Sequence, residues 1–195
     1  YKLYKLFLRM EDNQRPFKLG LALSGGGARG FAHLGVYKAM QELGIKPDII
    51  SGTSAGAIAG VIFASGHSAE EGIDFFKGKK VLDFARPLVS KTGIMHMTGL
   101  EKKLSDFIRV KTFEDLQIPL VVTATNMNLG IPTHFNTGEV VPRVLASCAI
   151  PIVFVPVTIN HHQYSDGGVF MNLPVRPIRD LCDVVIGVHI DPLEP

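Results

Sequence analysis

The chain has 195 residues, of which 46% are hydrophobic and 19% are charged, and its formal net charge is +2. These values describe a globular domain with a sizeable core and exclude a disordered segment. The lack of a dense Lys or Arg run argues against nucleic acid as a partner, and no apolar stretch is long enough to span a bilayer. Cys148 and Cys182 lack metal or redox spacing, so both are expected to be reduced and buried.

Residues 1–17 form an N-terminal segment ahead of the domain expected over residues 18–195. Its first ten residues alternate apolar and basic side chains at the spacing of a short amphipathic helix. We expect this helix to dock against its own domain or a neighbouring chain, with peripheral membrane contact as the alternative. The chain is accordingly expected to be cytoplasmic or peripheral to a membrane, and its oligomeric state stays open.

The domain opens with two strand–helix units in close succession. The apolar run Leu19–Leu23 predicts a strand buried on both faces, followed by the Gly-rich loop 24–30 and a helix over Phe31–Leu43. Asp48–Ser51 predicts the second strand, and Ser54–Ala64 the second helix. Such alternation favours parallel βαβ units and therefore an α/β fold, a three-layer α/β/α arrangement around a mainly parallel central sheet.

Two later helices carry start signals. Ser68 is followed three residues later by Glu71, which is the capping-box pattern for a helix that runs through Phe76. Thr98 and Glu101 repeat the same spacing and predict another helix that starts at Thr98.

The remaining chain is assigned from periodicity and composition. Residues 77–97 have no clear period and predict a mobile loop or lid, whereas residues 119–124 predict a strand of β-branched residues. Residues 126–136 predict a turn and an edge strand, residues 140–149 a helix, and residues 184–190 a last buried strand. No internal repeat or second-domain linker is present.

The sequence Gly52-Thr53-Ser54-Ala55-Gly56 carries the clearest chemical signal. It follows the β-branched end of a predicted strand and precedes a helix of small residues. A serine in such a turn has its hydroxyl pushed out of the backbone, and small neighbours allow the helix to double back close to the strand. This is the G-x-S-x-G nucleophile elbow, which predicts Ser54 as a nucleophile.

The upstream loop contains Gly25, Gly27 and Gly30 at the G-x-G-x-x-G spacing that also marks dinucleotide sites. A dinucleotide site needs an acidic residue at the end of the second strand, whereas Asp48 stands at its beginning. Nucleotide binding is therefore disfavoured. Successive glycines can instead turn their backbone N–H groups toward a developing oxyanion, and this loop is expected beside Ser54 because both follow parallel strands.

A nucleophilic serine needs a proton acceptor. The order Ser54, Asp183, His189 fits the chain order of an α/β-hydrolase triad, but that fold has several strands before its elbow and this chain has one. The adjacent His161 and His162 would point to opposite faces of a strand. The histidines are therefore interpreted as ordinary surface or core residues.

Asp166 is the better candidate for the acceptor. It is followed by Gly167 and Gly168, a pattern that in isolation usually marks only a turn. The tightly specified segment Asn172-Leu173-Pro174-Val175 follows. A carboxylate beside a serine can take its proton directly if its environment raises its pKa toward the working pH.

Taken together, the ordered motifs resemble those of patatin-like phospholipases, the Ser-Asp dyad lipid acyl hydrolases, over about Leu19–Ile190. The motifs are residues 23–30, 52–56, 146–151 with Phe154, and 166–168 with Asn172 and Pro174. Ser24 stands where plant members often have Asp, as in many bacterial-type members. The resemblance also implies further helices beyond Pro195.

The resemblance implies a patatin-like fold and a set of roles. Ser54 would be the nucleophile and Asp166 its partner, with an oxyanion hole from Gly25, Gly26 and Gly27. Arg29 would order the loop or meet a substrate phosphate, the first being favoured. The motif residues that would support this site are Gly30, Gly52, Gly56, Gly167 and Gly168.

The expected reaction is hydrolysis of fatty-acyl esters of lipids or phospholipids, with a lipid ester as substrate, and without metal or cofactor. A general carboxylesterase or thioesterase that acts on soluble acyl esters is one alternative. A non-catalytic member that binds acyl chains or a partner protein is another.

Overall fold

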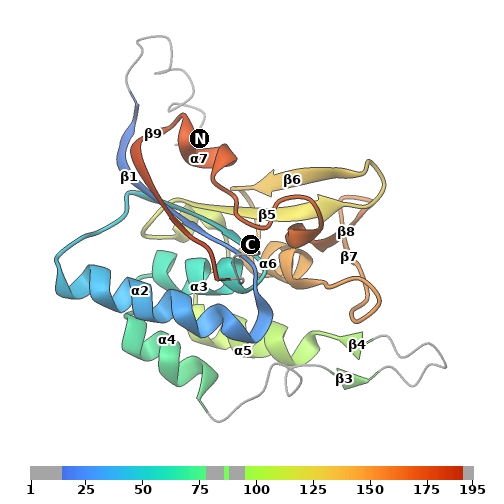
Figure 1. The fold of residues 1–195 in the computed structure, drawn as a ribbon. Coiled ribbons are helices and arrows are strands. Elements are labelled where there is room, and N and C mark those ends of the chain that lie inside the picture. The colour runs from blue at the N-terminus through green and yellow to red at the C-terminus, as the bar shows by residue number, and fades with distance from the viewer. Residues whose placement is uncertain (1–14, 78–85, 88–94, 191–195) are drawn as a thin grey trace, which may run out of the picture.

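A computed structural model describes residues 15–77, 86–87 and 95–190 (Figure 1). The amphipathic helix expected in residues 1–14 and most of the loop expected over residues 77–97 lie outside the described residues. No helix in the described ranges is long and apolar enough to cross a membrane.

A seven-stranded sheet forms the centre, in the order β7-β8-β5-β2-β1-β9, with β6 also paired to β5. Its strands are β1 (Phe17–Leu23), β2 (Ile49–Thr53), β5 (Leu120–Asn126), β6 (Ile131–Phe135), β7 (Val157–Ile159), β8 (His162–Asp166) and β9 (Cys182–Val188). The pairs β1–β2, β1–β9 and β2–β5 are parallel, whereas β6 and β8 lie antiparallel to β5, and β7 antiparallel to β8. The predicted α/β architecture with parallel central strands is confirmed.

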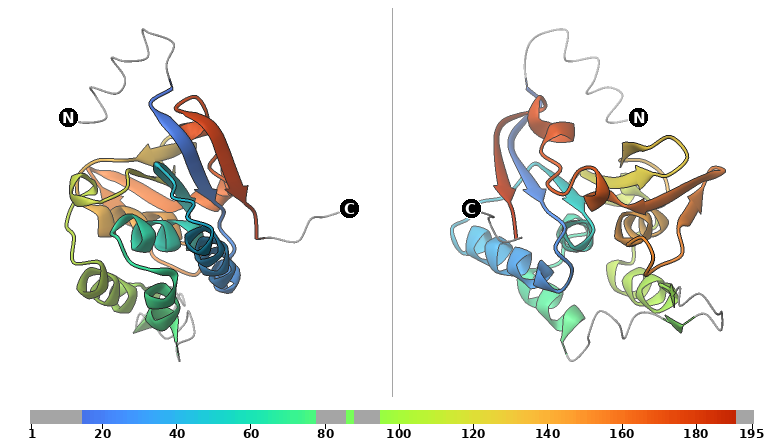
Figure 2. Two further views of the ribbon diagram at one scale, coloured as in Figure 1. Left: turned by 90° about the vertical axis from the view of Figure 1, so that its left-hand side faces the viewer. Right: turned by 45° about the vertical axis from the view of Figure 1, so that its right-hand side comes forward.

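Helices cover the two faces of the sheet unequally (Figures 1 and 2). One face carries α2 (Phe31–Glu42), α3 (Ala55–Ala64), α4 (Ala69–Phe76), α5 (Thr98–Ile108) and α6 (Val140–Cys148), and the other carries α7 (Arg176–Arg179). The short elements are β3 (Arg86–Pro87), β4 (Met95–His96) and the 3-10 helices η2 (Gly27–Gly30), η4 (Phe113–Asp115) and η5 (Gly167–Val169).

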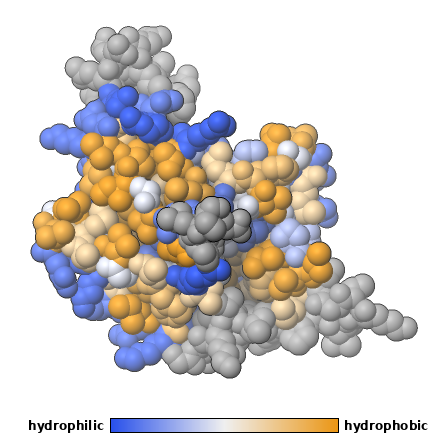
Figure 3. All heavy atoms as spheres, viewed as in Figure 1, coloured by the Kyte–Doolittle hydropathy of each residue, from blue (hydrophilic) through white to orange (hydrophobic). Residues whose placement is uncertain are grey.

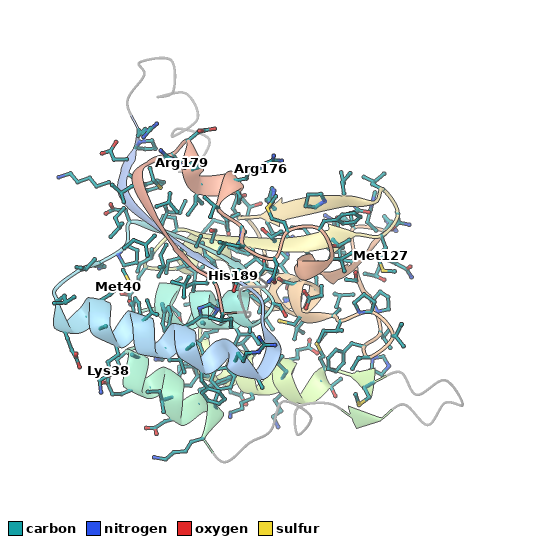
Figure 4. All side chains as sticks on the ribbon, in the orientation of Figure 1. Lys38, Met40, Met127, Arg176, Arg179 and His189 are labelled. Atoms are coloured by element: carbon teal, nitrogen blue, oxygen red, sulfur yellow. The ribbon has the colours of Figure 1, made fainter. Side chains whose placement is uncertain are left out.

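The side chains of the central strands alternate between two cores, as the pleat of a strand requires. Leu21 of β1 and Ile50 of β2 belong to the large core under α3 and α6, whereas their neighbours Ala22 and Ile49 face the smaller core around Ile178 of α7. Burial on both faces explains why these strands read as continuous apolar runs. Figure 4 shows Arg176 and Arg179 at α7, on the opposite side of the sheet from Lys38 and Met40 of α2.

The last strand differs from its prediction. β9 ends at Val188, has β1 as its one neighbour in the sheet among the described residues, and leaves Val184 57% exposed rather than buried. Figure 3 shows a broad hydrophobic surface over β1 and β9. His189, labelled in Figure 4, therefore lies beyond the strand and is exposed instead of falling inside a buried strand.

The two predicted helix starts have different outcomes. Ser68 and Glu71 form the capping box in full, because the Ser68 side chain accepts from the Glu71 N–H and the Glu71 carboxylate accepts from the Ser68 N–H. Helix α5 does begin at Thr98, but its N-cap residue is Met97 and no side chain caps it. The spacing of Thr98 and Glu101 therefore marked the start of the helix correctly and its cap wrongly.

Asp48 has a structural role at the beginning of the sheet. Its Oδ2 accepts hydrogen bonds from the backbone N–H groups of Lys18 and Leu19 at 3.0 and 2.9 Å. The carboxylate therefore fastens the start of β1 to the start of β2, at the opposite end of these strands from the Gly-rich loop.

Strands β2 and β8 approach each other along one edge of β5. β6 pairs with β5 over residues 122–126, so it occupies one edge, and both β2 and β8 must occupy the other. On that edge β2 ends with Thr53 opposite Thr123, and β8, running the opposite way, ends with Asp166 opposite Ala124. Two strands distant in sequence thus stop at neighbouring residues of β5, and the chain turns sharply at Ser54 where they meet.

Candidate active site

The hydroxyl of Ser54 and the carboxylate of Asp166 are in direct contact. Ser54 Oγ donates a hydrogen bond of 2.6 Å to Asp166 Oδ2, and both residues are buried. The other carboxylate oxygen accepts a 2.8 Å hydrogen bond from the N–H of Gly168. In the described part of the chain, neither side chain is hydrogen-bonded to a histidine.

The environment of Asp166 alters its acidity. Burial raises the pKa of this carboxyl above its ordinary value, against the hydrogen bonds from Ser54 and Gly168, which lower it. A carboxylate with a raised pKa is a stronger base than an ordinary aspartate. The carboxylate is thus suited to accept the proton of the serine hydroxyl with which it is in contact.

Ser54 adopts a backbone conformation that non-glycine residues rarely take, with φ 52° and ψ −119°. Its backbone is fastened to α6 on both sides. The Ser54 N–H donates to Ser147 Oγ at 2.8 Å, Ser147 donates in turn to the carbonyl oxygen of Thr123 at 2.6 Å, and the Cys148 thiol donates to the Ser54 carbonyl oxygen at 3.4 Å. The surroundings therefore hold the strained turn in place, as is common at functional sites.

Replacement of Ser147 with Ala is expected to lower the free energy of unfolding by about 1–3 kcal/mol, because the buried N–H of Ser54 loses its acceptor. Urea unfolding measures this change. Ser105→Ala is the matched control, since Ser105 is exposed on α5. Equal stability of the two variants would contradict the role given to Ser147.

The glycines around Ser54 are explained by close backbone approach. A Cβ on Gly52 would lie 2.4 Å from the carbonyl oxygen of Gly56, and a Cβ on Gly56 would lie 2.2 Å from that of Leu23. Helix α3 therefore crosses directly over the ends of β1 and β2. The small residues of the elbow are required by this crossing, as the sequence pattern predicted.

The Gly-rich loop lies beside the serine. The N–H of Gly25 donates to the carbonyl oxygen of Asn172 at 3.0 Å, so in this structure the donor is engaged within the protein. The N–H groups of Gly26 and Gly27 have no acceptor among the described residues. Gly26 and Gly27 have φ values of 158° and 56°, and Gly27 lies in the left-handed region that favours glycine.

His33 of α2 contacts the backbone at the start of this loop. Sequence reasoning did not single it out. It is fully buried in α2, and its Nε2 lies 2.8 Å from the carbonyl oxygen of Ser24. Because a carbonyl only accepts, Nε2 carries the proton and donates. Burial lowers the pKa of His33 despite this hydrogen bond, which favours the neutral ring.

The remaining motif residues are Arg29 and three glycines, and close approach occurs at the glycines. Arg29 is exposed, and its guanidinium donates to the carbonyl oxygen of Ile190 at 3.5 Å. A Cβ on Gly30 would lie 2.9 Å from the Cβ of Ala55. A Cβ on Gly167 would lie 2.2 Å from the carbonyl oxygen of Thr123, and one on Gly168 would lie 3.0 Å from the Asp166 carboxylate. These glycines allow the elements that carry Ser54 and Asp166 to pack closely.

Two hollows meet at Ser54. An apolar cavity of about 80 Å³ extends from Ser54 along Ala55 and Ile58 of α3 toward Phe76 and Leu100. An open cleft of about 340 Å³ is also lined by Ser54 and lies between the glycines of the loop and Asp166. Ser54 therefore lines both an apolar cavity and a partly polar cleft.

Both cysteines are buried thiols, as expected, and Cys148 lines the apolar cavity. Burial raises the pKa of the Cys148 thiol. The described residues contain no group of three His, Cys, Asp or Glu side chains arranged to hold a metal ion.

Comparison with known proteins identifies the family. The sequence model of the patatin-like phospholipase family matches residues 21–179. The chain belongs to the patatin-like phospholipase family. The match includes the Gly-rich loop, the elbow and Asp166, which are the motifs on which the resemblance was based.

Relatives in this family include an uncharacterized NTE family protein of Mycobacterium tuberculosis, 32% identical over 188 residues, covering 94% of this chain and 52% of that protein. The lysophospholipase nte1 of Aspergillus fumigatus is 32% identical over 189 residues, covering 90% of this chain and 12% of that protein. The chain thus spans about half the length of the mycobacterial relative.

Solved structures show the same fold at low sequence identity. VipD from Legionella pneumophila superposes with a TM-score of 0.59 and 18% identity, covering 82% of this chain and 47% of VipD. ExoU from Pseudomonas aeruginosa, solved in complex with SpcU, gives 0.55 and 23%, covering 74% and 40% of the two chains. Both establish the patatin-like fold of the chain.

Proposed function

We propose that the protein is a serine hydrolase that cleaves fatty-acyl esters of lipids or phospholipids. The observation that carries the proposal is the 2.6 Å hydrogen bond from Ser54 Oγ to the buried Asp166 carboxylate, at the junction of an apolar cavity and an open cleft. Membership of the patatin-like phospholipases and likeness to lysophospholipases support it.

In the proposed mechanism Ser54 Oγ attacks the ester carbonyl carbon while Asp166 accepts the hydroxyl proton. The new C–O bond puts negative charge on the carbonyl oxygen, and the N–H groups of Gly26 and Gly27 stabilise this charge. Such donors typically lower the barrier by about 2.7–4 kcal/mol each. Gly25 contributes by shaping the loop, since its own N–H is bonded to Asn172.

The tetrahedral intermediate collapses when Asp166 returns the proton to the leaving alcohol, which leaves the acyl group on Ser54. Asp166 then takes a proton from water, the water oxygen attacks the acyl carbon, and the fatty acid leaves as Ser54 recovers its proton. The apolar cavity would receive the part of the acyl chain next to the ester carbonyl, because its lining offers hydrocarbon surface and no charge.

Covalent labelling with a fluorophosphonate probe tests the proposal. The wild-type protein is expected to be labelled at Ser54, because a phosphonate captures a serine activated for attack. Ser54→Ala is the control, and equal labelling of this variant, or none of the wild type, would refute the serine hydrolase. Micellar lysophospholipid compared with short soluble esters then separates a lipid hydrolase from a general esterase or thioesterase.

A further inference from the structure

Two turns beside the open cleft present large apolar side chains to solvent. One turn follows α6, and the other is η5 with the residues after it. Their exposed fractions are 40% for Ile150, 91% for Ile152, 51% for Val169 and 55% for Phe170. We call these four side chains the hydrophobic rim. Ile150 and Val169 also line the cleft that contains Ser54 and Asp166, so the rim borders its opening.

Ile152 stands out within the rim. Its φ is 71°, in the left-handed region, which a β-branched residue adopts only at a cost in strain. Its side chain is nevertheless 91% exposed and gains little packing within the molecule. The folded chain by itself therefore does not account for an isoleucine at this position.

The rim is also uncharged. The segments 149–156 and 167–175, which carry its side chains, contain no Asp, Glu, Lys or Arg. Entry of these turns into an apolar medium would therefore bury no charge, so the large penalty for desolvating an ion is avoided. An uncharged apolar surface of this kind is suited to a partner whose interior is hydrocarbon, such as a lipid layer.

The position of the rim beside the cleft favours a lipid aggregate over a protein as its binding partner. A protein seated on the rim would cover the cleft and shut Ser54 off from substrate, whereas a lipid aggregate seated there delivers substrate to the opening. The apolar surface also continues inward, because Ile150 lines both the cleft and the apolar cavity. Ile150 therefore offers an acyl chain hydrocarbon contact where the cleft meets the cavity.

We propose that the hydrophobic rim inserts into the surface of a lipid aggregate and seats the cleft on it. This inference rests on the proposed function for its choice of occupant. Because the rim carries no charge, its binding does not need anionic lipid and withstands high salt.

Vesicle flotation of the whole chain tests the proposal without requiring catalysis. All proteins carry Ser54→Ala, and the vesicles are zwitterionic phosphatidylcholine in high salt, which screens attraction to basic residues. Ile152→Asp and Phe170→Asp are each expected to lower the partition coefficient at least tenfold, because a charge replaces buried hydrocarbon. Asp also adopts the left-handed region more readily than Ile, so position 152 retains its backbone.

Leu43→Asp is the matched control, since Leu43 is 74% exposed at the other end of α2 from η2, and it should bind as the parent does. Failure of the parent to float, or equal flotation of all variants, overturns the proposal. If the rim variants instead abolish a concentration-dependent dimer in the absence of lipid and leave flotation unchanged, the rim binds a second copy of the chain and the proposal is wrong.

Activity with Ser54 present separates the two proposals. Ile152→Asp should hydrolyse a soluble butyrate ester at the wild-type rate and vesicle phospholipid at least tenfold more slowly. If the rim variants lose flotation but the protein with Ser54 hydrolyses neither ester, the membrane role of the rim stands and the proposed hydrolase function is refuted. An equal loss of activity on both substrates would refute the proposed role of the rim in lipid binding.

Discussion

Replacement of Asp166 with Asn is expected to lower kcat/KM for ester hydrolysis by about 10²–10⁴-fold, the usual contribution of a positioned general base. Asn has the same shape, and its side-chain oxygen can still accept the hydrogen bond from Gly168. It cannot take the proton of Ser54. Steady-state kinetics on a soluble ester measures the effect, and retention of more than a tenth of the activity would contradict the assignment of Asp166 as the base.

The same variant has an expected effect on stability with a definite sign. Because burial raises the folded-state pKa of Asp166 above its unfolded value, the ionised carboxylate opposes folding at neutral pH. That penalty disappears as the pH falls through the raised pKa. Asp166→Asn should therefore be more stable than wild type at pH 7, and the difference should shrink toward the ordinary carboxyl range near pH about 3.9. Urea unfolding at both values tests this.

A histidine variant separates a dyad from a triad. His189 has the chain order of a triad histidine, but it is exposed and makes no hydrogen bond with Ser54 or Asp166. His189→Gln is therefore expected to retain most of the activity that Asp166→Asn loses. A similar loss in both variants would indicate a triad.

Replacement of Gly56 with Ala is expected to destabilise the protein by about 3 kcal/mol, at the upper end of the usual cost of overpacking. The added Cβ would lie 2.2 Å from the carbonyl oxygen of Leu23 and 2.6 Å from that of Ser24, and backbone atoms cannot give way as flexible side chains do. Helix α3 would have to move off β1, and Ser54 at its start would move with it. The free energy of unfolding measured in urea and the rate of fluorophosphonate labelling should both fall.

Gly35→Ala is the matched control for this change. Gly35 is exposed in the middle of α2, and a Cβ there meets nothing within 4 Å. Its replacement should stabilise the protein by about 0.5–1 kcal/mol, because alanine has less conformational freedom to lose than glycine. Destabilisation of similar size in both variants would mean that glycine at position 56 is not required by the crossing of α3.

The sequence was sufficient for the α/β class and for the residues that meet at the site. The continuous apolar runs identified the central strands because those strands are buried on both faces, and the elbow glycines identified the tight crossing at Ser54. The burial predicted for β9 was wrong because its residues are just as apolar, although in the described part of the chain it pairs only with β1. Hydrophobicity reports what a strand could bury, and only the sheet order shows what covers it.

The contacts that hold Ser54 in place were out of reach of sequence reasoning. Ser147 and Cys148 belong to a motif that was recognised, yet nothing in the chain indicated that they bind the backbone of Ser54. The same holds for the bond from Gly25 to Asn172 and for His33 beneath the loop. Such partners are set by the docking of elements far apart in sequence, which local patterns do not encode.

The meeting of β2 and β8 on one edge of β5 has a consequence for biosynthesis. Ser54 and Asp166 are 112 positions apart, and the base is in place only when β8 has paired with β5. During synthesis the elbow leaves the ribosome long before its base. On the proposed mechanism, a nascent or truncated chain exposes the serine without activating it. On the same mechanism, ester cleavage would begin only once the domain is complete.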